Sequence, residues 1–140
     1  MKSDLKGNIG LGKAISYFTE QGYIVSLPLT DHQCYDLIVE KNGNLQMVQV
    51  RYTGCIGPYG NFIARLETKN SEKTFYNIKD TYCDLLFYYC ENGDMFLIPI
   101  KDIIQKHTIN LYRTKSKYTQ KDGFDSSKYL INNAARVTPP

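Results

Sequence analysis

Residues 35–51 read YDLIVEKNGNLQMVQVR, with an Asn-Gly pair at positions 42 and 43 between two mostly apolar runs. Asn-Gly favours a two-residue type I′ turn, because both turn positions need a positive φ angle. The predicted hairpin places Asp36 directly opposite Gln49, with Arg51 two residues farther along the same strand and face. Since side chains on neighbouring strands lie roughly 5 Å apart, the sequence predicts that a carboxylate, an amide and a guanidinium converge.

The other face of this hairpin is apolar and is expected to join the core. It carries Tyr35, Leu37, Val39, Val48 and Val50. The polar trio then projects from the opposite face, where such residues usually form a solvated surface with a weak ion pair. The alternative is a site that binds an ion, and the hairpin alone leaves both interpretations open.

Length and composition predict one globular domain. The chain has 140 residues, of which 42% are hydrophobic and 22% charged, enough to bury a core. No apolar run approaches the roughly 18 residues of a membrane helix, and the polar start MKSDLKGN lacks a secretory signal, so we expect a cytoplasmic protein. Four cysteines without C-x-x-C spacing and only two histidines make a zinc site unexpected.

The order of helical and strand patterns predicts an α/β fold. A helix is expected over residues 4–21, because Gly22 stands where a helix commonly ends. A second Asn-Gly pair, at positions 92 and 93, predicts another hairpin, and its apolar strands indicate burial on both faces. A short helix is expected over residues 101–106. The predicted strands cover residues 23–27, 35–40, 45–53, 61–68, 83–90 and 95–100.

The stretch YDLIVEKNGNLQMVQVRYT resembles the catalytic hairpin of PD-(D/E)XK nucleases, in which an acidic residue faces an (E/D/Q)-x-K segment on the next strand. The preceding KGNIGLGKAISYFTEQGYIVSLPL is similar to the opening helix and first strand of that family. With PYGNFIARLETKN and CDLLFYYCENGDMFLIPI, the resemblance covers about residues 6–104, and it extends to the small group I intron-encoded homing endonucleases of bacteria. It implies a restriction-endonuclease-like core, in which an N-terminal helix is followed by a mixed central β-sheet.

The resemblance also implies a metal-dependent active site. Phosphodiester hydrolysis in this family depends on Mg²⁺, and Mn²⁺ or Ca²⁺ could replace it for binding. Asp36 corresponds to the anionic metal ligand, and Gln49 to a neutral ligand through its amide oxygen. The carbonyl of Val50 is the third expected ligand.

Two positions depart from the family pattern. The opening helix of the family commonly supplies a Glu after K-G-x-x-G, where this chain has Leu11, and the Lys of the motif is replaced by Arg51. Leu11 cannot bind a metal. Arg51 can neutralise a phosphate, but its pKa above about 12 prevents it from acting as a general base. Either the site is weakened or inactivated by these residues, or its chemistry tolerates them.

The positive charge of the chain is concentrated at its C-terminal end. Residues 101–140 contain eight basic and three acidic residues (8 − 3 = +5), whereas residues 1–100 contain nine and eleven (9 − 11 = −2). The alternative to DNA contact is a solvated basic loop, but with the nuclease resemblance we expect a DNA-contacting extension over about residues 107–140 of a single nuclease domain. The expected DNA contacts are Arg113, Lys115, Lys117, Tyr118, Gln120 and Lys121, with Lys6 and Lys13 on the first helix.

These observations predict a sequence-specific homing endonuclease that cuts double-stranded DNA. Because one site cuts one strand, cleavage of both strands implies a homodimer or a homotetramer. Two alternatives remain: a Holliday-junction-resolvase-like or repair nuclease, and a DNA-binding module that does not cleave.

Overall fold

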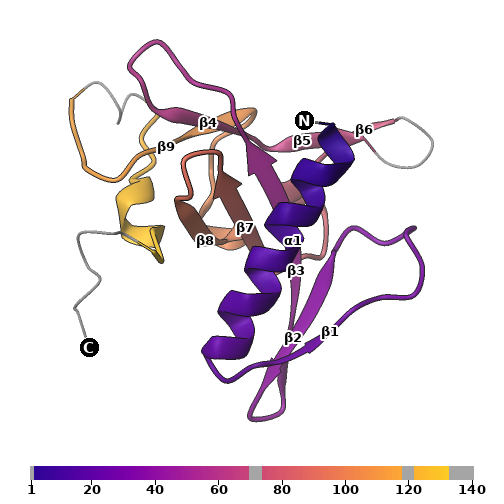
Figure 1. Cartoon of the computed structure of the whole chain (residues 1–140). Helices are drawn as coiled ribbons and strands as arrows, with labels where there is room; N and C mark the ends of the chain where they lie inside the picture. Colours follow the sequence, from indigo (N-terminus) through magenta and orange to yellow (C-terminus); the bar gives the residue numbers. More distant parts are fainter. Residues whose placement is uncertain (1, 70–73, 118–121, 133–140) are drawn as a thin grey trace, which may run out of the picture.

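The computed structural model describes residues 2–69, 74–117 and 122–132, and it places one helix against a five-stranded sheet (Figure 1). The strand order is β1-β2-β3-β7-β8, and only the central pair β3 and β7 is parallel. This arrangement confirms the predicted N-terminal helix and mixed central sheet. The elements are α1 (Ser3–Glu20), β1 (Ile24–Ser26), β2 (Leu37–Lys41), β3 (Asn44–Thr53), β7 (Leu85–Cys90) and β8 (Met95–Pro99).

The helix α1 ends where the sequence predicts. Gly22 has φ +87°, a conformation that glycine adopts without steric cost. Its N–H donates to the Thr19 carbonyl at 3.0 Å, and the N–H of Tyr23 donates to the Phe18 carbonyl at 2.9 Å, which together form a Schellman motif. The chain therefore turns back toward the sheet directly after the helix. No helix in the described part of the chain is long and apolar enough to cross a membrane.

The predicted type I′ hairpin is present between β2 and β3. Asn42 and Gly43 both have positive φ, and the pairing of Lys41 with Asn44 continues as predicted to Leu37 opposite Val48. The regular ladder stops there. Asp36 lies in a bend before β2, and its N–H donates to the Val48 carbonyl at 2.8 Å instead of continuing the register, so the predicted pairing of Asp36 directly opposite Gln49 does not form.

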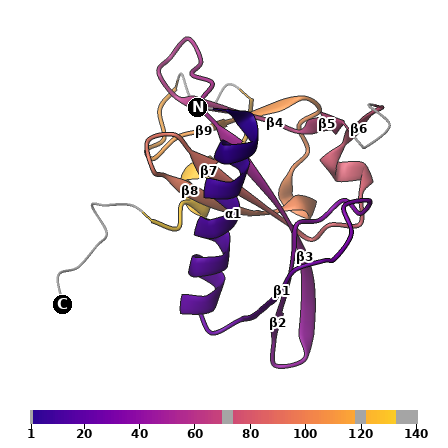
Figure 2. The ribbon, with the colours of Figure 1, turned by 45° about the vertical axis from the view of Figure 1, so that its right-hand side comes forward.

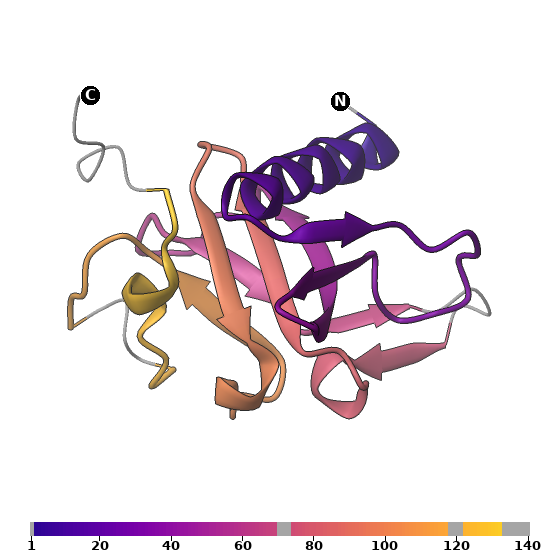
Figure 3. The same ribbon diagram turned by 90° about the horizontal axis from the view of Figure 1, so that it is seen from below.

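Apolar side chains cover both faces of the sheet. On one face, Leu37, Val39 and Val48 pack with Phe18 of α1, as the hairpin pattern predicts. The second face is covered by β9 and the C-terminal segment, which lie on the side of the sheet away from α1 (Figure 3). Tyr35, expected with the first set, packs in this second cluster because it precedes the point where the regular ladder begins.

The predicted strand over residues 61–68 is divided in two. Leu66 interrupts it with a buried side chain, so its two halves join different two-stranded sheets. The first pairs β4 (Phe62–Arg65) with β9 (Thr108–Leu111), and the second pairs β5 (Glu67–Lys69) with β6 (Phe75–Asn77). The strands β6 and β9 are absent from the sequence-based prediction.

The second predicted hairpin forms between β7 and β8 and is buried on both faces. The predicted helix over residues 101–106 is wrong. Only a 3-10 turn, η2 (Ile100–Asp102), is present, and Ile103 is extended. Packing explains why the helix does not form, because Ile100 and Ile103 are both buried in the core. The remaining 3-10 turns are η1 (Ile78–Asp80) and η3 (Ser126–Tyr129).

The described part of the basic C-terminal region is packed into the domain. Leu111 belongs to a paired strand, and Phe124 and Leu130 are buried in the cluster that covers the second face of the sheet. Leu130 also forms an isolated bridge with Phe96 of β8. These contacts fix the backbone on either side of residues 118–121.

Candidate functional site

Asp36 lies at the entrance to the hairpin, and its carboxylate is held by the neighbouring strand. Its Oδ2 atom accepts a hydrogen bond from the N–H of Val50 at 2.8 Å. The residue lines a hollow of about 310 Å³ beside α1, named here the Asp36 hollow, together with Leu11 and Tyr35. Burial raises the pKa of the Asp36 carboxyl, while the Val50 N–H and the Arg51 guanidinium act in the opposite direction.

Gln49 and Arg51 form a pair in an adjoining hollow of about 440 Å³, named here the Arg51 hollow. Hydrogen bonding assigns the orientation of the Gln49 amide. Its oxygen accepts from Nη2 of Arg51 at 2.6 Å, and its nitrogen donates to the Cys34 carbonyl at 3.2 Å. Gln49 is only 5% exposed, so it is a buried residue that positions Arg51 and not part of a solvated face.

The predicted trio is thus divided between two adjacent hollows. Asp31 and Gln33, in the segment between β1 and β2, line both of them. Although the trio does not converge on one point, Arg51 lowers the pKa of Asp36 and is therefore electrostatically connected to it. A phosphodiester is a group that could contact the carboxylate side and the guanidinium side at once.

Leu11 occupies the position that the resemblance assigns to an acidic residue, and it lines the Asp36 hollow. Its side chain is half-buried and packs against the core beneath α1. A carboxylate at position 11 would therefore enter the same hollow as Asp36. The apolar side chain of Leu11 instead forms part of the wall of that hollow.

The residues present supply a limited set of metal ligands. Among the described residues, no group of three or more His, Cys, Asp or Glu side chains is arranged to hold a metal ion. Mg²⁺ can nevertheless be held by a single carboxylate when water and substrate phosphates complete its shell. Asp36 supplies such a carboxylate, and the Val50 N–H holds it in place. The Gln49 oxygen would first have to exchange its hydrogen bond with Arg51.

Comparison with known proteins identifies the family. The family model for the PD-(D/E)XK endonuclease matches residues 1–129. The chain belongs to this family. Its fold is also that of a bacterial homing endonuclease, I-Ssp6803I, with a TM-score of 0.74 and 24% sequence identity over 93% of this chain and 89% of that one.

A second solved structure, that of MepB, is 13% identical over 88% of this chain and 97% of the other, with a TM-score of 0.46. No curated protein matches the sequence. As a member of the PD-(D/E)XK endonuclease family, this chain is a nuclease of that type. Such nucleases generally use divalent metal ions.

Of the basic residues predicted to contact DNA, those that the structure describes do not line either hollow. Arg113 is paired with Asp94 through Nη2 and Oδ1 at 2.7 Å, and Lys115 lies 3.4 Å from Asp125. Lys117 is exposed. On α1, the Nζ atom of Lys6 lies over the Tyr52 ring, 5.6 Å from the ring centroid, and Lys13 is exposed. Tyr118, Gln120 and Lys121 lie outside the described residues.

Several residues that line the Arg51 hollow are not predicted by the sequence patterns. Thr68 and Tyr76, from the β5–β6 pair, and Asp80, from η1, line this hollow together with Arg51. Figure 2 shows this pair of strands extending from the body of the domain. The short alternating segments around positions 68 and 76 could have indicated strands. Only the pairing of these strands with each other brings Thr68 and Tyr76 to the site.

Proposed function

We propose that this PD-(D/E)XK family member is a homing endonuclease that hydrolyses phosphodiester bonds at specific sites in double-stranded DNA. The observation that carries the proposal is the placement of Asp36, held by the Val50 N–H, beside the Arg51 guanidinium, held by Gln49. A carboxylate and a guanidinium in adjoining hollows suit a phosphate whose charge increases during the reaction. We propose Mg²⁺ as the metal ion.

Each residue of the site has a distinct proposed role. Asp36 would hold the metal ion, with the Val50 carbonyl and the Gln49 amide as neutral ligands. The ion would lower the pKa of its bound water and stabilise the pentavalent transition state. Arg51 would bind a nonbridging phosphate oxygen with its planar array of donors, and Gln49 would keep the guanidinium in that orientation. Arg51 cannot remove a proton from water, so it contributes through charge.

Cleavage of both strands requires two copies of this site. We therefore propose that the chain acts as a homodimer or as a homotetramer, whose symmetry matches that of the DNA target. Light scattering with and without duplex DNA tests this assembly. A monomer that cuts both strands at the same rate would contradict it.

The departures at positions 11 and 51 favour one alternative function. With Leu11 in place of an acid, Asp36 is the one carboxylate that the family pattern leaves in the site, which suits a DNA-binding module that cleaves slowly or not at all. A junction-resolving or repair nuclease would share the same hairpin but prefer branched DNA.

A selection experiment separates these functions. The wild-type chain and the Leu11→Glu/Arg51→Lys variant are incubated with Mg²⁺ and a library of linear and branched duplexes, and the cut and the retained molecules are sequenced. Cleavage of one long linear site by either protein supports a homing endonuclease, and preferred cleavage of branched DNA supports a resolving enzyme. Retention without cleavage supports a binding module, and neither cleavage nor retention would contradict the proposal.

A further inference from the structure

The β5–β6 pair, called here the ribbon, is a two-stranded sheet separate from the central sheet (Figure 1). Its base is fixed in the core, because Leu66 and Ile78 are both buried and the Ile78 N–H donates to the Leu66 carbonyl at 2.8 Å. Beyond that base the strand residues are exposed or partly buried, and Phe75 is 64% exposed. A rigid base with an exposed, two-stranded projection is suited to entering a groove of a partner.

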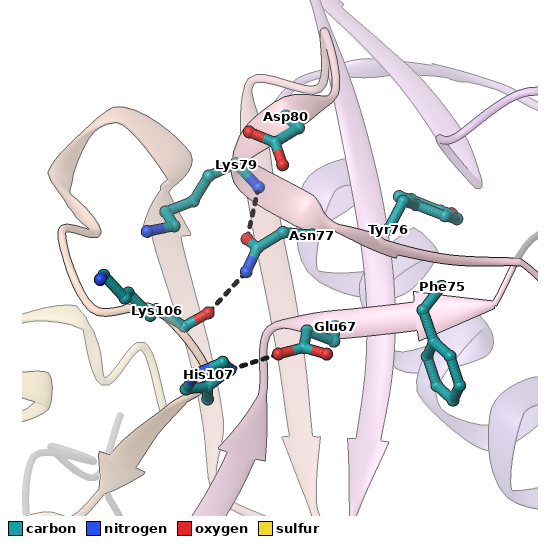
Figure 4. Close-up of a pocket in the computed structure, with 8 residues that line it drawn as sticks. All are labelled: Glu67, Phe75, Tyr76, Asn77, Lys79, Asp80, Lys106 and His107. Atoms are coloured by element: carbon teal, nitrogen blue, oxygen red, sulfur yellow. Dashed lines mark hydrogen bonds and ion pairs between the residues drawn. The ribbon is translucent and has the colours of Figure 1, made fainter.

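The ribbon borders two hollows, and Tyr76 lines both of them. Thr68 pairs with Tyr76, and both side chains line the Arg51 hollow. The neighbouring pair, Glu67 and Asn77, faces the other side, since successive side chains alternate along a strand. That side borders a third hollow of about 390 Å³, named here the lysine hollow (Figure 4).

The lysine hollow is lined by two lysines, Lys79 and Lys106, that form no ion pair in the described part of the chain. The Asn77 amide connects their segments, because its oxygen accepts from the Lys79 N–H and its nitrogen donates to the Lys106 carbonyl (Figure 4). The backbone segments that carry the two lysines are therefore held together.

The lysine hollow is also lined by two acidic residues, Glu67 and Asp80. Glu67 is hydrogen-bonded to His107. Asp80, like Tyr76, lines both the lysine hollow and the Arg51 hollow, so it lies where the two hollows meet. Cations thus line both hollows, Arg51 and Lys69 in one and the two lysines in the other, and Asp80 lies where the hollows meet.

We propose that the ribbon enters the major groove of duplex DNA, with the phosphate to be cleaved in the Arg51 hollow and a phosphate of the opposite groove wall in the lysine hollow. The inference rests on the proposed nuclease function and adds the DNA-positioning surface. The major groove, about 12 Å wide, admits a two-stranded ribbon, and phosphate backbones border it on both sides. Lys79 and Lys106 are positioning residues, and base-edge contacts would come from the ribbon itself.

Binding of a random-sequence duplex at several salt concentrations, in the absence of divalent metal, tests the two lysines. Loss of two phosphate contacts in Lys79→Ala/Lys106→Ala should reduce the salt slope by roughly 2 and weaken binding roughly 30-fold at 0.15 M salt. The matched control is Lys101→Ala/Lys128→Ala, which removes two exposed lysines outside all three hollows. Asp80→Asn should have the opposite effect and tighten binding.

The groove is tested by competition on the same duplex. Methyl green, which occupies the major groove, should displace the protein, and netropsin, which occupies the minor groove, should not. An unchanged salt slope in Lys79→Ala/Lys106→Ala, equal loss in the control, displacement by netropsin alone, or equal affinity for single strands would overturn the inference and leave the nuclease proposal standing. If the wild-type chain bound no nucleic acid at all, both would fail.

Discussion

At the residue scale, Asp36 and Arg51 are linked although they line different hollows. Burial raises the pKa of the Asp36 carboxyl, and the nearby Arg51 guanidinium partly opposes this effect. Replacing Arg51 with Gln removes the cation, so the pKa of Asp36 should rise further, whereas Arg51→Lys should largely preserve it. A pH titration of the Asp36 carboxyl carbon by NMR measures this change. A lower pKa in Arg51→Gln would contradict the described geometry.

The raised pKa of Asp36 also predicts the direction of a stability change with pH. Because the folded state holds this proton more tightly than the unfolded state does, ionisation of Asp36 lowers the free energy of unfolding as pH rises through the range between the two pKa values. Asp36→Asn should therefore be more stable than the wild type at neutral pH, and the gain should shrink below the unfolded pKa. Thermal unfolding of both proteins at neutral pH and at a pH below the unfolded-state pKa tests this prediction. A variant that is less stable at neutral pH would show that the carboxylate is favourably paired.

At the element scale, the hairpin between β2 and β3 depends on its turn. Gly43 has φ +83°, so Gly43→Ala should lower the free energy of unfolding by about 1–2 kcal/mol. Gly12→Ala is the matched control, because Gly12 is exposed in α1 and an added Cβ has nothing within 4 Å. It should raise stability by about 0.5–1 kcal/mol. Urea unfolding measures both, and equal effects would contradict the assigned turn.

The same hairpin shows what the sequence can predict. Asn42-Gly43 and the alternating apolar residues determine a local register, and the structure has it from Leu37 to Lys41. The bend at Asp36 could not be predicted this way, because it arises where the ladder ends and the carboxylate takes the Val50 N–H. The ribbon also escaped prediction, since β5 and β6 are three residues each and form only through their mutual pairing.

At the scale of the whole molecule, burial on both faces of the sheet should separate the four cysteines by reactivity. Cys55 is exposed, whereas burial raises the pKa of Cys83 and of Cys90 to about 12. Near pH 8, iodoacetamide should modify Cys55 much faster than Cys83 or Cys90, because the thiolate is the reactive form. Peptide mass spectrometry over time measures the rates, and unfolding in urea should equalise them. Early modification of Cys90 in the native chain would contradict the described core.

We propose that Asp36 and Arg51 form a PD-(D/E)XK site whose activity is limited by positions 11 and 51. The direct test is single-turnover cleavage of duplex DNA in Mg²⁺ by the wild type, by Leu11→Glu/Arg51→Lys, and by each of these with Asp36→Asn added. We predict that the double variant cuts on the order of 100-fold faster than the wild type and that Asp36→Asn abolishes cleavage in both. No cleavage by any of the four proteins, or cleavage that survives Asp36→Asn, would contradict the claim.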